Sequence, residues 1–203
     1  NVYLSGRDGE GAYLATTTTD TAVECTGANH DLVLPCRTLG AQPFPVGTIT
    51  AAWRGRVLVA VGDALWASRP SAPHLADWRD FKPLGSPITA VQPVDDGIYV
   101  GTEKELVFLA GTSWDALSFT ATGHGSVVPG SGVSAPGQDI QLGEGTGRGA
   151  AMLCIAGGEV VAGFAGGQTV SLTDGRYCTD VQEVCATFRD LPGVGPQYLA
   201  VPQ

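Results

Sequence analysis

The sequence has few basic residues and no long apolar run. Lys and Arg together number 11 against 20 Asp and Glu, which gives a formal net charge of −9. Contacts to phosphates need clustered Lys and Arg, so no specific nucleic-acid partner is expected. No stretch approaches the ~18–20 continuous apolar residues of a membrane-spanning helix, so no membrane partner is expected either.

Long helical periods are also lacking, and Met occurs once. Charged residues make up only 15 % of the chain, whereas Gly occurs 29 times. This composition indicates a turn-rich, all-β protein. The 203 residues, 43 % of them hydrophobic, are enough for one large domain or two small ones with a proper core.

One stretch, residues 97–111, has the clearest local pattern. Its two apolar runs, Ile98–Val100 and Leu106–Leu109, have the β-branched and aromatic bias of strands. The five residues between them, Gly101–Glu105, are short enough for a hairpin loop. The stretch therefore predicts a β-hairpin.

Similar units recur along the chain. Residues 56–68 contain two apolar runs around Gly62-Asp63, residues 150–172 contain three runs separated by Gly pairs, and residues 2–15 form a shorter copy. Strand units that repeat at roughly 40–50 residues are typical of β-propeller blades. We therefore expect an all-β, β-propeller-like array of about four short antiparallel blades. A β-sandwich or prism with ordinary hairpins has the same rhythm and stays an alternative.

The repeats divide the chain into four predicted parts. Residues 1–47 hold a first, partial blade and a connection, and residues 48–111 hold two blade repeats. Residues 112–149 form a Gly-rich insertion or arm, and residues 150–203 hold the last blade and the C-terminal strands. Because the chain starts at Asn1 inside an expected strand, we interpret it as part of a longer protein.

The Gly-rich part is the strongest candidate for a contact surface. Residues 123–149 contain nine glycines and few large apolar side chains, so this part is not expected to form a core of its own. A loop of this length inside a compact domain often binds a partner. We expect a surface arm that contacts neighbouring subunits through Gly123, His124, Val127, Val128, Pro129 and Pro136.

The sequence contains no recognisable catalytic or metal-binding constellation. The three histidines, His30, His74 and His124, lie in unrelated loops, and the pattern around Asp95-Asp96-Gly97 is that of a turn. The glycines at 143, 145 and 147 lack the strand and helix that a phosphate-binding loop needs. We therefore expect neither an enzyme nor a cofactor or metal site.

The five cysteines show no metal-ligand spacing. They are odd in number and lack a Cys-x-x-Cys pair or a neighbouring His. Cys25 and Cys36 flank a turn-rich loop and would be close enough in sequence to bridge in an oxidising compartment, whereas Cys154 lies in an apolar run typical of a buried thiol. The preferred interpretation is that all five are reduced.

Three stretches resemble structural proteins of tailed bacteriophages. They are residues 56–70, residues 88–102 and residues 172–177. The first two resemble patterns of the type R-L-x-V-A-x-G-x-x-L-x-x-S-x-P and I-x-x-V-x-P-V-x-x-G-I-x-V-G-T, with Val57 in place of the first Leu. Such patterns recur in tail hub, nozzle and packaged-DNA stabilisation proteins of short-tailed phages. The resemblance covers roughly residues 48–203.

The resemblance implies a virion component, assembled in the bacterial host cytoplasm, that forms a symmetric homo-oligomer and binds other virion or tail proteins. It carries no catalytic residues over to this chain. The alternative is a carbohydrate-binding or glycan-degrading propeller used in host adsorption. In that case Trp78 and Trp114, which lie in expected loops, would be exposed and would stack on sugar rings.

Overall fold

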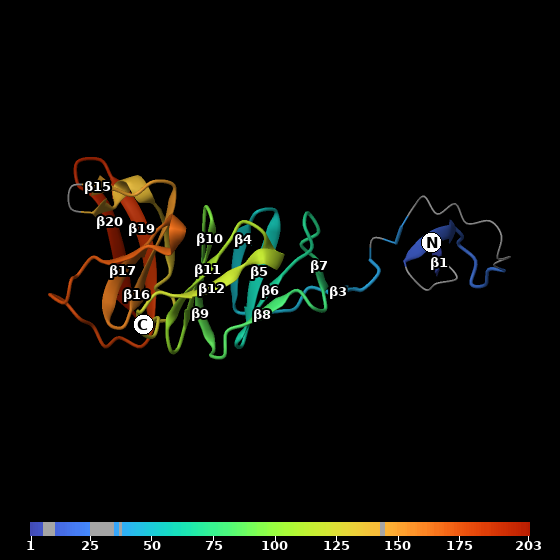
Figure 1. The fold of residues 1–203 in the computed structure, drawn as a ribbon, viewed down its shortest axis with the longest axis horizontal. Coiled ribbons are helices and arrows are strands. Elements are labelled where there is room, and N and C mark those ends of the chain that lie inside the picture. The colour runs from blue at the N-terminus through green and yellow to red at the C-terminus, as the bar shows by residue number, and fades with distance from the viewer. Residues whose placement is uncertain (6–10, 25–34, 37, 143–144) are drawn as a thin grey trace. The chain divides into compact units, whose positions relative to one another are not determined.

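The computed structural model describes residues 1–5, 11–24, 35–36, 38–142 and 145–203 (Figure 1). The chain is all-β, as its composition predicts, and is built from several small antiparallel sheets. The sheets form no closed propeller in the part of the chain that the structure describes. The chain divides into two compact units, Asn1–Pro43 and Phe44–Gln203.

The N-terminal unit contains the predicted first hairpin. Strands β1 (Val2–Ser5) and β2 (Ala12–Thr16) pair antiparallel, and the pairing shifts register between Val2 and Tyr3. The unit also holds β3 (Ala41–Pro43). The apolar run Leu32–Leu34 also indicates a strand pair, and it lies outside the described residues.

The first sheet of the C-terminal unit confirms the hairpin predicted at 56–68. Its strands are β4 (Ile49–Trp53), β5 (Arg56–Val61), β6 (Ala64–Ala67) and β8 (Phe81–Pro83), in that order. Arg54 and Gly55 both have positive φ, 46° and 74°, as the tight turn between two twisted antiparallel strands requires. β7 (Leu75–Asp77) lies in the connection before β8.

The second sheet contains the hairpin predicted at 97–111. Its strands run in chain order from one edge to the other, as β9 (Ile88–Val94), β10 (Gly97–Thr102), β11 (Leu106–Ala110) and β12 (Ser118–Ala121). Gly97 lies opposite Ala110 and Gly101 opposite Leu106, so the predicted pairing is confirmed. Asp95 and Asp96 form the turn between β9 and β10, as their sequence predicts.

The third sheet combines three predicted strands with one that was not expected. Strands β16 (Ala150–Ala156), β17 (Glu159–Gly163) and β18 (Thr169–Ser171) pair antiparallel as the repeat predicts. β13 (Val133–Pro136), from the Gly-rich part, joins them beside β16. The chain between β13 and β16 contains two two-residue strands, β14 (Gln141–Leu142) and β15 (Gly145–Thr146), which pair with each other.

The two predicted C-terminal strands pair with each other. β19 (Val184–Leu191) and β20 (Gly195–Pro202) form a long hairpin, called the C-terminal hairpin below. The helices are single turns of 3₁₀ type: η1 (Trp114–Ala116), η2 (Gly137–Asp139) and η3 (Ala165–Gly167).

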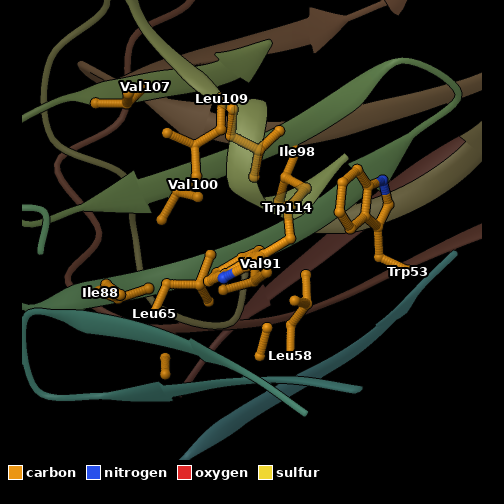
Figure 2. Close-up of a cluster of buried hydrophobic side chains, with 13 residues drawn as sticks. Trp53, Leu58, Leu65, Ile88, Val91, Ile98, Val100, Val107, Leu109 and Trp114 are labelled. Atoms are coloured by element: carbon orange, nitrogen blue, oxygen red, sulfur yellow. The ribbon is translucent and has the colours of Figure 1, made fainter. Parts of the chain in front are cut away.

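Three apolar clusters lie between successive sheets of the C-terminal unit. The first lies between the first and second sheets, where Leu58 and Leu65 face Ile98 and Leu109 (Figure 2). The second lies between the second and third sheets, and the third between the third sheet and the C-terminal hairpin. Each four-stranded sheet is thus too small to bury both faces alone and is covered by its neighbours.

A buried tyrosine ties the second sheet to the third. Tyr99 of β10 is 1 % exposed, and its hydroxyl donates to the carbonyl oxygens of Phe164, at 2.7 Å, and Gln168, at 3.0 Å. A Cβ at Gly163 would lie 2.6 Å from the Tyr99 ring, so this strand needs glycine for the sheets to approach each other. Burial raises the pKa of Tyr99 above its ordinary value.

The segment 123–131, predicted to be part of a surface arm, has an exposed side but is anchored in the unit by two buried residues. Val127 is 2 % exposed and Ser131 is fully buried. The backbone N–H groups of Val127 and Val128 donate to Thr102 O and Ile155 O, each at 2.9 Å. The segment therefore fills the space between the second and third sheets. Its glycines permit close packing, since a Cβ on Gly130 would overlap the carbonyl oxygen of Val184.

Candidate functional site

A cavity of about 360 Å³ opens beside this inserted segment. Four parts of the C-terminal unit enclose it: the start of β9, the β10–β11 loop, residues 126–129 and the residues just before β19. Its lining consists of Thr89, Glu103, Ser126, Val127, Val128, Pro129, Val181 and Gln182.

Backbone hydrogen bonds fix the wall that residues 126–129 form. Besides the bonds of Val127 and Val128 to the neighbouring sheets, the Ser126 carbonyl accepts from Gly157 N at 2.8 Å. Val127 also packs against β10, since a Cβ on Gly101 would lie 2.7 Å from the Val127 side chain. This wall is therefore held by both sheets, and its Val127 belongs to the second apolar cluster.

The β10–β11 loop carries the only carboxylate among the lining residues. Thr102 closes this loop: its Oγ1 donates to Glu105 O at 2.9 Å and accepts from Lys104 N and Glu105 N at 3.2 and 3.0 Å. Glu103 N donates to Pro87 O at 3.0 Å, which holds the loop against the chain leading into β9. Glu103 is exposed at the edge of the cavity.

The opposite wall comes from the segment that leads into the C-terminal hairpin. Thr179 N donates to Gly158 O at 2.9 Å, and Val184 N donates to Pro129 O at 3.1 Å. Between these two anchors, Gln182 Nε2 donates to Asp180 O at 2.8 Å. Val181 and Gln182 are thus held over the cavity at both ends.

Thr89 is the buried polar group of this lining. It is 8 % exposed, and its Oγ1 has no hydrogen-bond partner among the described residues. The β9–β10 pairing is irregular here, because Gly101 lies opposite Ala90 while Thr102 lies opposite Ile88, so Thr89 has no partner across the ladder. A buried unpaired hydroxyl costs about 1–3 kcal/mol.

A second cavity of about 250 Å³ has Val181 in its lining as well. Its lining is mostly apolar and includes two tyrosines, Tyr177 and Tyr198. Tyr198 donates its hydroxyl to Ser131 O at 2.8 Å, and burial raises its pKa above the ordinary value. Tyr177 is 63 % exposed and so presents a ring at the opening.

The lining of the first cavity offers hydrogen bonds and apolar contacts, and Glu103 is its one carboxylate. It combines one carboxylate, one amide and two hydroxyls with three valines and a proline, and holds no Lys, Arg, His or Cys. Across the described residues, no three His, Cys, Asp or Glu side chains are grouped closely enough to hold a metal ion. The arrangement can bind a polar, uncharged ligand.

Three of the six predicted arm residues line this cavity, namely Val127, Val128 and Pro129. Gly123 has a φ of +83° in a turn, and His124 Nε2 lies 3.0 Å from Thr169 Oγ1. Pro136 ends β13 opposite Ala150. The sequence therefore located one wall of the cavity among its candidates.

The predicted pair of exposed tryptophans is not present. Trp114 lies in η1, is 3 % exposed and contributes to the first apolar cluster, with Lys82 Nζ 5.5 Å from its ring centre. The expectation that it stacks on sugars is wrong, because its ring is needed in the core. Trp78 is 57 % exposed, and the Arg79 guanidinium lies 4.2 Å from its ring centre.

The structure describes four of the five cysteines. Cys154 is 1 % exposed in β16, and burial raises the pKa of its thiol to about 12. Cys178 and Cys185 are exposed free thiols. The bridge considered between Cys25 and Cys36 involves Cys25, which lies outside the described residues.

Sequence reasoning missed Thr89, Glu103 and Gln182. Thr89 appeared only as part of an apolar strand, and Glu103 only as a loop residue of the predicted hairpin. Thr is common in strands, so no local signal distinguishes Thr89. That Gln182 would lie near them depends on how distant segments pack.

No family model matches the sequence, and no curated protein is similar to it. No helix in the part of the chain that the structure describes is long and apolar enough to cross a membrane.

Proposed function

We propose that this chain is a non-enzymatic structural component of a phage virion, at the tail or tail tip, where it mediates subunit assembly. The main support for this proposal is where the residues that resemble phage proteins lie in the fold. Residues 56–70 supply β5 and β6 of the first sheet, and residues 88–102 supply β9 and β10 of the second. The similar sequences thus build the shared core between two successive sheets, which is a structural role.

We also propose that these sheets are the blades of a β-propeller. Three four-stranded antiparallel sheets follow one another along the chain, and each shares an apolar cluster with the next. Small sheets that cover one another in sequence are what a propeller requires. Further sheets, from other copies of this chain, would complete the ring.

The C-terminal hairpin offers the surface for such a contact. Its inner face packs Phe188 and Tyr198 against the third cluster. Cys185 lies opposite Val201 on the other face, where both are exposed, Val201 at 63 %. In a stack of sheets this outer face would be covered by the next one. We assign that place to a second copy of the chain, in a symmetric homo-oligomer that also binds other virion proteins.

Replacing Val201 by Glu tests this proposal. The wild-type chain is expected to form a symmetric oligomer, measured by size-exclusion chromatography with light scattering. Val201→Glu should shift it to the monomer, because a desolvated, unpaired charge at an interface costs several kcal/mol. Val46→Glu is the matched control, since Val46 is 94 % exposed and lies outside the hairpin. A wild-type monomer at every concentration would contradict the proposal.

The acidic composition agrees with this role. A net charge of −9 favours solubility and disfavours binding to nucleic-acid phosphates. We therefore infer protein partners, a location in the virion after assembly in the bacterial cytoplasm, and no specific nucleic-acid contact.

A further inference from the structure

We propose that the cavity lined by Thr89, Glu103, Ser126 and Gln182 binds a neutral, hydroxyl-rich ligand of the carbohydrate class. This activity goes beyond the assembly role and does not depend on it. It also differs from the sugar contact expected at Trp78 and Trp114, because it uses another part of the C-terminal unit.

The charges of the lining disfavour anions and metal ions. Anions would meet the Glu103 carboxylate and find no Lys, Arg or His in the wall. A calcium ion takes six to eight oxygen ligands, usually with several carboxylates, whereas this lining supplies one. A ligand without net charge remains the best match to the lining.

The polar groups of the lining suit hydroxyl groups in particular. A sugar hydroxyl both donates and accepts, and so do the side chains of Thr89, Ser126 and Gln182, while Glu103 accepts. Val127, Val128, Pro129 and Val181 provide apolar surface for the C–H face of a ring. The volume, about 360 Å³, falls in the range typical of small-molecule sites.

Thr89 gives the cavity a buried group whose hydrogen-bonding capacity is unused. Its Oγ1 has no partner among the described residues, so it contributes nothing to the fold through hydrogen bonding. A small shift of the side chain toward the cavity would let a ligand hydroxyl pair with it. Binding would then recover the free energy lost when this hydroxyl was buried.

The second cavity extends the site to a second sugar unit. The two cavities share Val181 as a lining residue, and the second is also lined by Tyr177, which is 63 % exposed. Aromatic rings provide flat apolar surface with a polar edge, which suits the faces of sugar rings. The proposal therefore favours a disaccharide or longer glycan over a single sugar.

The test uses the full chain with lactose, maltose and N,N′-diacetylchitobiose as probes, followed by saturation-transfer NMR and titration calorimetry. At least one probe should bind to the wild type. Thr89→Val keeps the side-chain shape, and it should weaken that binding about tenfold while leaving the unfolding midpoint unchanged or higher. Failure of all three disaccharides to bind would overturn the proposal.

Further variants show whether a bound disaccharide occupies this cavity or another part of the surface. Gln182→Ala and Tyr177→Ala, both at exposed positions, should also weaken binding, whereas Trp78→Ala should not. If the disaccharide still binds to each of Thr89→Val, Gln182→Ala and Tyr177→Ala as it does to the wild type, the proposal is overturned. It is also overturned if Trp78→Ala is the one variant that loses disaccharide binding. Binding of butylammonium instead of any disaccharide, abolished by Glu103→Gln, would identify an amine site and equally overturn it.

Discussion

Single hydroxyl groups hold the inserted segment in place between the second and third sheets. Ser131 is fully buried, and its Oγ donates to Val128 O at 2.6 Å and accepts from Ile155 N at 3.1 Å. Its own carbonyl accepts the hydroxyl of Tyr198 at 2.8 Å. One small side chain thus connects the segment to β16 and supports its contact with the C-terminal hairpin.

Ser131→Ala should lower the free energy of unfolding by about 1–3 kcal/mol, because it leaves the buried Ile155 N–H and Val128 carbonyl without this partner. Urea denaturation of the full chain measures the change. Ser118→Ala is the control: Ser118 is exposed on β12, and its effect should stay within about 0.5 kcal/mol. Equal effects of the two substitutions would contradict the structural role of Ser131.

The buried thiol of Cys154 makes stability depend on alkaline pH. Burial raises its pKa from 9.0 to about 12, so the unfolded chain loses this proton at lower pH than the folded chain. The stability contribution is complete below about pH 9 and is lost as the pH rises toward about 12. Tyr99 and Tyr198, whose pKa values are also raised by burial, act in the same direction at higher pH.

The free energy of unfolding, measured by urea denaturation across this range, should therefore fall as the pH rises. The expected slope is near 1.4 kcal/mol per pH unit for each titrating group. Cys154→Ala should reduce the slope in the lower part of the range, although it lowers stability at neutral pH by opening a small cavity. An unchanged slope in Cys154→Ala would show that this thiol is not buried.

At the scale of elements, glycines decide how closely the segments approach. A Cβ on Gly101 of β10 would lie 2.7 Å from the Val127 side chain, a distance that real contacts do not show. Gly125 lies in the same segment as Val127. A Cβ added there would lie 3.4 Å from its nearest neighbour, the Gly157 Cα, so this position has space for a methyl group. The two positions form a matched pair.

Gly101→Ala should destabilise the chain by about 1–3 kcal/mol through overpacking, whereas Gly125→Ala should be close to neutral. The double variant Gly101→Ala/Val127→Gly should cost less than the sum of the two single changes, because removing the whole Val127 side chain, its Cβ included, relieves the clash. Chemical denaturation measures all four proteins. Strict additivity would mean that Val127 does not pack on β10.

The sequence predicted the strands whose partners are close along the chain. The hairpins at 56–68 and 97–111, and the three strands of 150–172, follow from local alternation and turn residues. It did not predict β13 or the burial of Val127. Residues 123–149 contain nine glycines and few large side chains, a composition that indicates an exposed arm. Those glycines permit close contacts with distant segments, which no local pattern contains.

The candidate site was predicted only in part for the same reason. Residues 127–129, predicted to contact a neighbouring subunit, line the cavity, and the subunit contact stays a prediction. Trp114 was assigned to an exposed loop, yet it fills the first apolar cluster, where its neighbours come from other strands. The unpaired hydroxyl of Thr89 becomes visible only once the irregular pairing of β9 with β10 is known.

At the scale of the whole C-terminal unit, stability and assembly have the same physical origin. Each sheet is covered by the next through an apolar cluster, and the C-terminal hairpin leaves Leu191, Val194 and Val201 exposed at 37 %, 63 % and 63 %. A further sheet on its outer face would continue the pattern. The proposed assembly extends between copies the packing that already joins the sheets within one copy.

A cryo-electron microscopy reconstruction of the purified full chain tests this account most directly. The account predicts a symmetric ring in which the outer face of the C-terminal hairpin, including Val201, is buried against a sheet of the neighbouring copy. A reconstruction that shows single copies, with this face in solvent, would contradict the proposed assembly role.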